Sequence, residues 1–231
     1  MNETLQIIEI FRSIQGESSL AGLPCVFVRL AGCNLRCSWC DSEYTFKGGR
    51  KMSSDEVMLE VARLATPNML VEITGGEPML QERELIPFIE RLLAAGYQVM
   101  IETSGERPLE SLPKAVRKIV DVKCPGSGES ASFREENLNT LTERDELKFV
   151  LTDRADYEYA RDFIRKHGLE QSGRELLLSP AFHKDAAGSR TTDNCMLDPR
   201  ELTEWMLADG LRARLALQVH KYIWEPQVRG V

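Results

Sequence analysis

Three of the six cysteines in this chain lie within the stretch GCNLRCSWCD, as Cys33, Cys37 and Cys40. Thiolates are soft ligands that suit zinc and iron–sulfur clusters. A disulfide needs two thiols, and a closed structural zinc site needs four ligands. Three thiolates can instead hold three irons of a 4Fe–4S cluster and leave the fourth iron open to a small molecule. The spacing therefore predicts an iron–sulfur centre with one open position.

A closed zinc site stays an alternative, because Cys124 or His220 could supply the fourth ligand. The remaining cysteines, Cys25 and Cys195, lack ligand spacing, as does Cys124 itself, and we interpret all three as ordinary thiols. The sequence alone leaves both metal sites possible, and it favours the open cluster because the cysteines directly follow a predicted strand.

Apolar runs that are typical of strands alternate with amphipathic helical segments. The predicted strands cover 25–32, 70–74, 97–103, 117–123, 145–151, 175–181 and 214–220, and the predicted helices cover 53–65, 84–96, 154–168 and 198–210. Ser53 and Glu56 form a capping-box signal before the first helix. In the second helix, Pro87 is expected in the first turn and Gly96 at the C-terminal cap. This alternation predicts an α/β fold with a mostly parallel sheet, either open or rolled into a barrel.

Unusual residues follow the ends of four predicted strands. The cysteines follow the first strand, and GGEP (75–78), ETSG (102–105) and DVKCP (121–125) follow the next three. Parallel α/β folds build their sites at the carboxyl ends of strands, so we expect one shared site at this edge. The polar segment 126–137 is predicted to be a flexible insertion within a single domain that covers 1–231.

The composition is that of a globular protein, with 42% hydrophobic and 28% charged residues and a formal net charge of −7. No cluster of lysines and arginines indicates nucleic-acid binding. The N-terminal segment lacks the pattern of a signal peptide, and no apolar run is typical of a membrane span. We therefore expect a cytoplasmic protein without a nucleic-acid or membrane partner, and in that reducing compartment clustered cysteines favour metal ligation over disulfides.

GCNLRCSWCD (32–41) and TGGEP (74–78) resemble the two characteristic motifs of radical S-adenosylmethionine (SAM) enzymes. The resemblance implies a modified, incomplete (β/α) barrel with a mostly parallel sheet. It also implies a [4Fe–4S] cluster whose open iron binds the amino and carboxylate groups of SAM. One electron from the cluster then cleaves SAM to a radical that abstracts hydrogen from the substrate.

Two longer segments are similar to one family of these enzymes. Residues 11–46 resemble the start of the 7-carboxy-7-deazaguanine synthase family, and HKYIWEPQVRGV (220–231) resembles its carboxyl terminus. This resemblance implies the conversion of 6-carboxy-5,6,7,8-tetrahydropterin to 7-carboxy-7-deazaguanine, with ring contraction and release of ammonia. It further implies Mg²⁺, a homodimer, a reducing partner such as flavodoxin or ferredoxin, and a pathway of the queuosine type, which modifies tRNA.

The resemblance also implies roles for residues at matching positions. The cluster ligands are Cys33, Cys37 and Cys40, and the Mg²⁺ ligand is Ser42. The expected SAM contacts are Trp39, Asp41, Gly76, Glu77, Ser104, Asp121 and Lys123. The expected substrate contacts are Ile14, Gln15, Gly16, Glu17, Arg29, Thr74, His220 and Lys221.

Some residues support or depart from these assignments. Arg29 lies inside an apolar strand, and burying an unpaired guanidinium is costly, so an anionic partner is expected. Ser42 stands where many relatives carry threonine, and Asp121 and Val122 replace the serine and proline expected before Lys123. Two other functions stay open: a radical SAM activase of another protein, and a zinc-binding module without catalysis.

Overall fold

All nine strands of the computed structural model, which describes residues 4–184, 191–226 and 228–231, belong to one sheet. The strands are β1 Thr4–Ile14, β2 Pro24–Leu30, β3 Arg50–Ser53, β4 Leu70–Gly75, β5 Gln98–Thr103, β6 Arg117–Asp121, β7 Glu146–Leu151, β8 Glu175–Pro180 and β9 Arg214–Leu215. The helices are α1 Ser54–Leu64, α2 Glu82–Ala94, α3 Arg154–Lys166, α4 Pro199–Asp209 and α5 His220–Ile223.

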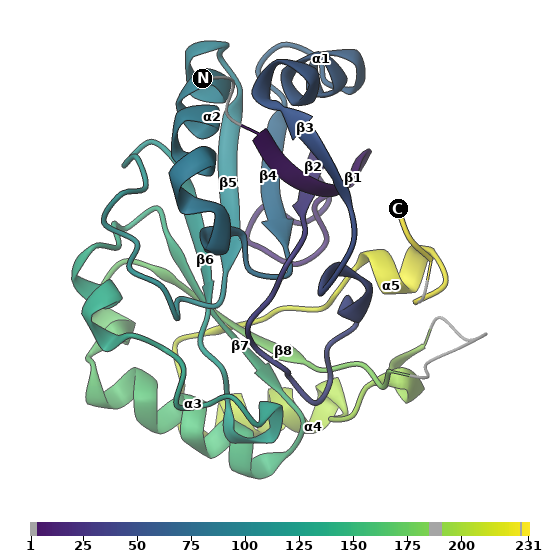
Figure 1. Ribbon diagram of the computed structural model, residues 1–231. Coiled ribbons are helices and arrows are strands. Elements are labelled where there is room, and N and C mark those ends of the chain that lie inside the picture. The colour runs from purple at the N-terminus through teal and green to yellow at the C-terminus, as the bar shows by residue number, and fades with distance from the viewer. Residues whose placement is uncertain (1–3, 185–190, 227) are drawn as a thin grey trace.

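The sheet is mostly parallel and does not close. Its order is β3-β1-β2-β4-β5-β6-β7-β8-β9, so β3 and β9 form the two edges. All pairs from β2 to β9 are parallel, and only β1 is antiparallel to its neighbours β2 and β3. Figure 1 shows α1 and α2 beside the first half of the sheet and α3 and α4 beside the second. These findings confirm the predicted α/β fold and incomplete barrel.

The two faces of the sheet have different cores. The main core lies between the helices and the sheet, where buried side chains such as Val57 of α1, Phe88 of α2 and Phe149 of β7 pack together. A smaller cluster contains Cys25, Phe27, Leu70, Met100 and Ile119, and its members come from β2, β4, β5 and β6. Side chains alternate between the two faces of the sheet along a strand. The members of the smaller cluster therefore point into the barrel, and the strand residues between them point to the helices.

The local helix signals are largely confirmed. Ser53 accepts a hydrogen bond from the Glu56 amide while the Glu56 side chain accepts one from Ser53, which completes the predicted capping box. Gly96 follows α2 with a φ of 85°, a left-handed conformation that favours glycine. The expected place of Pro87 is wrong, because α2 begins at Glu82 and Pro87 lies inside the helix. A 3₁₀ turn over Pro78–Gln81 leads directly into α2 and moves its start towards the N-terminus.

The strand predicted over 214–220 is largely wrong. Only Arg214 and Leu215 pair with β8, and His220 begins the short helix α5. The sequence prediction also missed β1 and β3, which contribute the antiparallel edge of the sheet. Backbone pairing depends on a partner that is distant in sequence, so an apolar run does not by itself form a ladder.

Segment 126–137, for which the sequence predicts a flexible insertion, has buried contacts near its two ends. The Gly126 amide donates to Asp156 Oδ1 at 2.7 Å, and Ser127 and Asn137 are fully buried. The Ser38 amide in the cysteine loop, which is the segment 31–42 between β2 and the 3₁₀ turn at Glu43–Thr45, donates to the Ser127 carbonyl at 2.9 Å. Ser127 and Asn137 therefore bind backbone groups of the core, and Ser127 also supports the cysteine loop.

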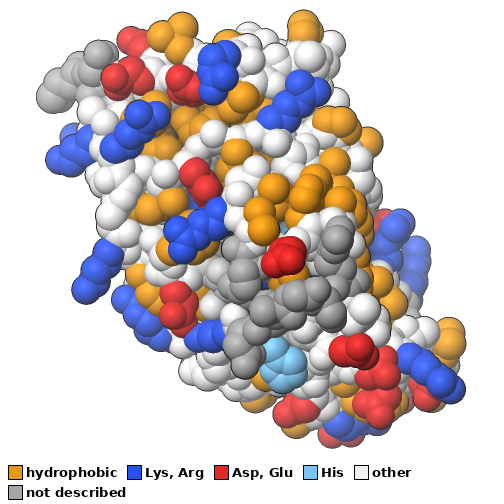
Figure 2. All heavy atoms as spheres, turned by 90° about the vertical axis from the view of Figure 1, so that its right-hand side faces the viewer, with side chains coloured by type: hydrophobic (Ala, Val, Ile, Leu, Met, Phe, Trp, Pro, Cys, Tyr) orange, Lys and Arg blue, Asp and Glu red, His pale blue; other side chains and the backbone are white. Residues whose placement is uncertain are grey.

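The surface carries charges of both signs. Figure 2 shows a face on which lysine, arginine, aspartate and glutamate side chains are scattered around a group of hydrophobic side chains. Within the described ranges, no helix combines the length and the hydrophobicity that crossing a membrane requires.

Candidate functional site

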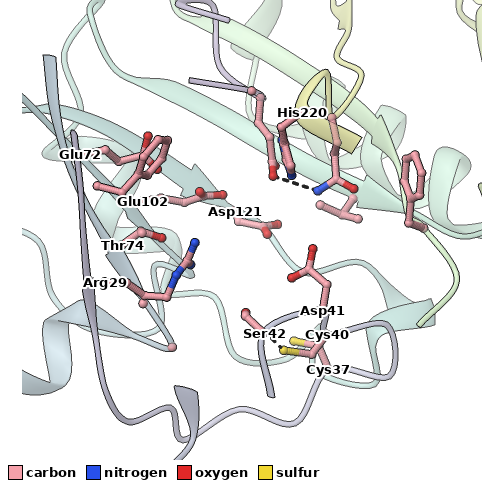
Figure 3. A pocket seen from close by; sticks show the side chains of 18 of the residues that line it. Arg29, Cys37, Cys40, Asp41, Ser42, Glu72, Thr74, Glu102, Asp121 and His220 are labelled. Carbon is pink, nitrogen blue, oxygen red and sulfur yellow. Dashed lines mark hydrogen bonds between the residues drawn. The ribbon is translucent and has the colours of Figure 1, made fainter. Parts of the chain in front are cut away.

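One cavity of about 280 Å³ lies at the carboxyl edge of the parallel strands. It is lined by every residue to which the sequence assigned a role: Cys33, Cys37, Cys40, Ser42, Trp39, Asp41, Gly76, Glu77, Ser104, Asp121, Lys123, Ile14, Gln15, Gly16, Glu17, Arg29, Thr74, His220 and Lys221. Figure 3 shows Cys37, Cys40 and Ser42 on one side of it and Glu72 and Glu102 on another. The predicted positions therefore share one space, with the cysteines on one side and Glu72 and Glu102 on another.

The cysteine loop is held by its own backbone and by its neighbours. The Cys40 amide donates to the Cys37 carbonyl at 3.2 Å, and Arg36 Nη1 donates to the Cys33 carbonyl at 2.8 Å. Burial raises the pKa of the Cys37 thiol to about 11, although Lys123 opposes this effect, and burial also raises the pKa of Cys33. Iron would have to displace these protons, because a metal binds the thiolate.

The geometry does not form the closed zinc site. In the described part of the chain, no three His, Cys, Asp or Glu side chains are placed to hold a single metal ion. Of the two possible fourth ligands, Cys124 is fully buried and is not among the residues that line the cavity. Figure 3 places His220 on a different side of the cavity from Cys37 and Cys40.

Gly76 brings the end of β4 against the cysteine loop. A Cβ atom at this position would lie 2.2 Å from the Gly32 carbonyl oxygen and 2.7 Å from Cys33 Cβ, which is closer than atoms approach. Glycine is therefore required for this contact, which fits the predicted site beside the cluster.

Glu77 connects the ends of β4 and β5. Its carboxylate accepts hydrogen bonds from Thr103 Oγ1 at 2.7 Å, from the Ser104 amide at 2.8 Å and from Ser104 Oγ at 2.7 Å. Two of the expected SAM contacts, Glu77 and Ser104, therefore bind each other. Their bonds fix the strand ends that border the cluster side of the cavity.

Two polar atoms beside the cysteine loop lack a partner among the described residues. Trp39 Nε1 is a buried donor, and Asp121 Oδ1 is a buried acceptor. Asp121 Oδ2 accepts from Lys123 Nζ at 2.6 Å, and the same ammonium lies 4.6 Å from the centre of the Trp39 ring. A buried polar group without a partner is costly, so these atoms fit a polar ligand such as SAM. The residues present thus fit an open cluster with SAM beside it.

Ser42 lies on the same side of the cavity, with its Oγ 3.8 Å from Cys40 Sγ. It provides an oxygen, the ligand type that Mg²⁺ prefers. A 3₁₀ turn over Glu43–Thr45 follows it, and both the amide and the hydroxyl of Thr45 donate to the Ser42 carbonyl. The turn therefore fixes the backbone of Ser42.

The loop between β1 and β2 supplies Gln15, Gly16 and Glu17. Gln15 Nε2 donates to Glu72 Oε2 at 3.0 Å, and its Oε1 accepts from the Glu17 amide at 2.6 Å. A Cβ atom on Gly16 would lie 2.2 Å from His220 Nδ1, so glycine allows the histidine to approach the loop. The Val219 amide donates to the Gly16 carbonyl at 2.9 Å. The C-terminal segment therefore packs directly on this loop.

Three charged residues that the sequence did not assign to the substrate, Lys148, Glu102 and Glu72, lie next to this loop and to Glu17. Lys148 of β7 binds Glu17 at 2.8 Å and also Glu102 of β5. Burial, followed by repulsion from Glu102, raises the pKa of Glu72 to about 8, and burial also raises the pKa of Glu102. Burial alone would raise the pKa of Glu17, but attraction to Lys148 outweighs it and the pKa is lowered. The sequence signal that could have identified Glu72 is a charged residue inside an apolar strand, LVEIT at 70–74.

Arg29 has the expected anionic partner. Its Nε donates to Glu9 Oε1 at 2.8 Å, and Thr74 is its neighbour in the register of β2 and β4. Burial alone would lower the pKa of Arg29, but Tyr44 and Glu9 outweigh it and the pKa is raised, so the guanidinium stays charged. Figure 3 shows Arg29 pointing into the cavity, between Glu72 and Glu102 on one side and Ser42 on the other.

The two C-terminal site residues have different surroundings. Lys221 Nζ donates to Asp41 Oδ2 at 2.6 Å, so its ammonium binds the cysteine loop. Burial alone would raise the pKa of Asp41, but Lys221 outweighs it and the pKa is lowered. Burial lowers the pKa of His220, so its imidazole is neutral at pH 7.

Comparisons with known proteins agree with this geometry. The family model of the radical SAM superfamily matches residues 28–126. A 7-carboxy-7-deazaguanine synthase of Koribacter versatilis is 64% identical over 98% of this chain and 100% of its own length, and one of Chlorobaculum tepidum is 41% identical over 98% and 97%.

Solved structures have the same fold. The crystal structure of QueE from Escherichia coli has a TM-score of 0.72 and 25% identity, and the match covers 94% of this chain and 95% of that one. Streptococcus suis SuiB bound to S-adenosylmethionine is 13% identical with a TM-score of 0.52, and it covers 80% of this chain and 44% of its own. With its three-cysteine cavity and its full-length relatives, the chain belongs to the 7-carboxy-7-deazaguanine synthase family of radical SAM proteins.

Proposed function

We propose that this chain is a lyase that converts 6-carboxy-5,6,7,8-tetrahydropterin to 7-carboxy-7-deazaguanine with release of ammonia. Full-length relatives named 7-carboxy-7-deazaguanine synthase support this reaction. The observation that carries the proposal is the composition of the cavity. Three thiols line one side of it, and Arg29 with a set of buried carboxyl groups lines another. A radical generated at the first side could therefore act on an anionic heterocycle held by the second.

The cluster side of the cavity is assigned to the cofactors. Cys33, Cys37 and Cys40 would hold the [4Fe–4S] cluster, which would supply one electron for the reductive cleavage of SAM. Trp39 Nε1 and Asp121 Oδ1 offer a donor and an acceptor to the polar groups of SAM. Lys123 fixes the Asp121 carboxylate through its own bond to Oδ2.

The opposite side is assigned to the substrate. Arg29 offers a guanidinium to the substrate carboxylate, an arrangement that favours two parallel hydrogen bonds. Glu72 is protonated at neutral pH, because its pKa lies at about 8, and it can donate a hydrogen bond to a ring oxygen or nitrogen. Glu17 and Glu102 contact Lys148, and their carboxyl oxygens can accept from ring N–H groups. His220 is neutral and can donate or accept.

Finer parts of the proposal rest on the family resemblance. Ser42 would place one oxygen ligand on Mg²⁺ beside the cluster. The enzyme would act as a cytoplasmic homodimer, with a flavodoxin or ferredoxin as reductant, in a queuosine-type 7-deazapurine pathway. One continuous sheet through the described residues supports a single domain.

The decisive experiment incubates reduced, cluster-reconstituted protein with SAM, Mg²⁺ and 6-carboxy-5,6,7,8-tetrahydropterin, and analyses the products by mass spectrometry. We expect 7-carboxy-7-deazaguanine and free ammonia, which together account for every atom of the substrate. A Cys37→Ala variant, which lacks one cluster ligand, should form neither of them. Cleavage of SAM by the wild type without any change in the pterin would contradict the proposal and would favour an activase.

A further inference from the structure

Arg29 is bound at one end only. Its Nε donates to Glu9 Oε1, but neither of its terminal nitrogens has a hydrogen-bond acceptor among the described residues. The side chain is 19% exposed, and it lines the cavity. The part of the guanidinium that recognises a carboxylate through two parallel bonds is therefore available to a ligand.

Glu9 holds this guanidinium from the neighbouring strand. Glu9 and Arg29 are register partners in the antiparallel pair of β1 and β2, and the Nε–Oε1 distance is 2.8 Å. Phe11 of β1 lies under the guanidinium, with its ring centre 5.7 Å from Cζ. Rotation about the long arginine side chain is thus restricted by one hydrogen bond and one aromatic face.

Tyr44 binds the same carboxylate oxygen. Its hydroxyl donates to Glu9 Oε1 at 2.9 Å. Burial raises the pKa of Tyr44 to about 12; the Arg29 charge opposes this rise, and the Glu9 carboxylate adds to it. The hydroxyl therefore stays a donor at neutral pH. One oxygen of Glu9 therefore accepts from both Arg29 and Tyr44.

Tyr44 also belongs to the segment that follows the cysteines. It lies in the 3₁₀ turn Glu43–Thr45, directly after Ser42, and the Thr45 amide donates to the Ser42 carbonyl at 2.9 Å. Glu9 thus connects the guanidinium in β2 with the turn that ends the cysteine loop.

We propose that Glu9 and Tyr44 are positioning residues that orient the terminal nitrogens of Arg29 towards the substrate carboxylate and fix this anchor relative to the cysteine loop. Neither Glu9 nor Tyr44 is among the residues to which the sequence motifs give a role. The inference rests on the proposed function, because the carboxylate of 6-carboxy-5,6,7,8-tetrahydropterin is the ligand.

Two effects of Glu9 oppose each other, and substitutions can separate them. As an acceptor, Glu9 orients Arg29 and increases affinity for a carboxylate. As an anion, it repels the same carboxylate. Glu9→Gln keeps an oxygen acceptor and removes the charge, whereas Glu9→Ala removes both. Tyr44→Phe removes only the hydroxyl and keeps the ring on which the Arg229 guanidinium stacks at 3.9 Å.

The test measures binding without turnover. Anaerobic calorimetry on cluster-reconstituted protein with SAM, in the absence of reductant, gives the Kd of 6-carboxy-5,6,7,8-tetrahydropterin and of 5,6,7,8-tetrahydropterin, which lacks the carboxylate. Wild type should prefer the carboxylated pterin. Glu9→Ala should reduce this preference about tenfold, because it removes the acceptor that holds Arg29, and Tyr44→Phe should reduce it about threefold, because it removes only one of the two donors to Glu9. Glu9→Gln should retain the preference.

Controls distinguish positioning from a structural effect. In an Arg29→Ala background, Glu9→Ala should cause no further loss of preference. Glu175→Ala removes a comparable carboxylate from Arg214, on β8 and β9 away from the cavity, and should leave both affinities unchanged. Iron content and the Kd of SAM should match the wild type in every variant.

The outcomes are separable. The positioning role would be overturned by any of three results with Glu9→Ala. The variant could keep the wild-type preference, it could bind the carboxylated pterin more tightly than wild type, or its affinity for both pterins could fall equally. A wild type that binds neither pterin would refute the proposed function itself, and the inference with it.

Discussion

At the scale of single residues, the unusual feature is a carboxyl group in the middle of an apolar strand. Glu72 is 1% exposed, and its carboxyl group accepts a hydrogen bond from Gln15 Nε2. Lys148 binds Glu17 and Glu102 but does not bind Glu72. Burial and repulsion from Glu102 outweigh the attraction of Arg29, so Glu72 binds a proton. A neutral acid at this position gives the cavity a hydrogen-bond donor that an ionised glutamate could not provide.

This proton makes the stability of the protein depend on pH. The pKa of Glu72 is about 8 in the fold, above the ordinary value of 4.5. Between these values the folded state binds more protons than the unfolded state, so the free energy of unfolding decreases as the pH rises through this window. Each pKa unit is worth about 1.4 kcal/mol, so we expect wild type to lose a few kcal/mol between pH 5 and 8. Glu72→Gln mimics the neutral acid and should flatten the profile.

Anaerobic thermal unfolding of both proteins at several pH values measures this difference. Glu17, Glu102, Lys148 and Arg29 line the same cavity, so their contributions remain in both proteins. A Glu72→Gln profile that falls as steeply as wild type from pH 5 to 8 would show that Glu72 is ionised in the fold.

At the scale of elements, the site depends on how closely two strand ends approach the cysteine loop. A Cβ atom on Gly76 would lie 2.2 Å from the Gly32 carbonyl oxygen. Gly76→Ala should therefore push the end of β4 away from the loop. We expect a loss of about 1–3 kcal/mol of stability, as for other overpacked sites. We also expect a lower iron content after reconstitution, measured by iron analysis and by the absorbance of the cluster.

Gly96→Ala is the matched control for this substitution. Gly96 has a φ of 85° after α2, and a Cβ atom there meets no heavy atom closer than 4.0 Å. Alanine should cost about 1 kcal/mol through backbone strain and leave the iron content unchanged. Equal iron content in both variants would show that the close contact of Gly76 does not position the cysteine loop.

Local patterns explain which elements could be predicted. The capping box at Ser53 and the buried parallel strands were correct, because each depends on residues that are neighbours in sequence or on a continuous apolar run. The order of the strand ends then placed all the motif residues around one cavity. What failed depends on distant partners: β3 forms only against β1, and the strand β9 ends at Leu215, so the predicted strand does not continue to 220. Glu9 belongs to an unpredicted strand, so no local signal could connect it with Arg29.

At the scale of the whole molecule, the C-terminal segment joins parts of the cavity that the open sheet leaves separate. After β9 at the sheet edge, the chain returns to the β1–β2 loop, where Gln218 Nε2 donates to Glu17 Oε1 at 2.8 Å. At Lys221 it reaches Asp41 in the cysteine loop. Figure 1 shows α5 on the same side of the molecule as β1 and the C-terminus. One short segment therefore contacts both the substrate side and the cluster side.

Lys221 is the residue on which this connection can be tested. Its side chain is 4% exposed and its ammonium lies 4.9 Å from the centre of the Phe182 ring, whereas Asp41 is 41% exposed. Lys221→Met keeps the apolar stem and removes the ion pair, and the half-exposed Asp41 can then be solvated. We expect stability to change by less than about 1 kcal/mol. Product formation should fall about 10- to 100-fold, because the cysteine loop is no longer held in place.

Hydrogen exchange separates this positioning effect from a general loss of structure. In Lys221→Met, the amides of 40–44 should exchange faster, while those of β4 and β5 should match the wild type. Arg200→Met is the control, because it removes an exposed ion pair with Glu204 on α4 and should change neither exchange nor turnover. Unchanged exchange in the cysteine loop of Lys221→Met, combined with reduced turnover, would place Lys221 in direct contact with the substrate, as its sequence motif first indicated.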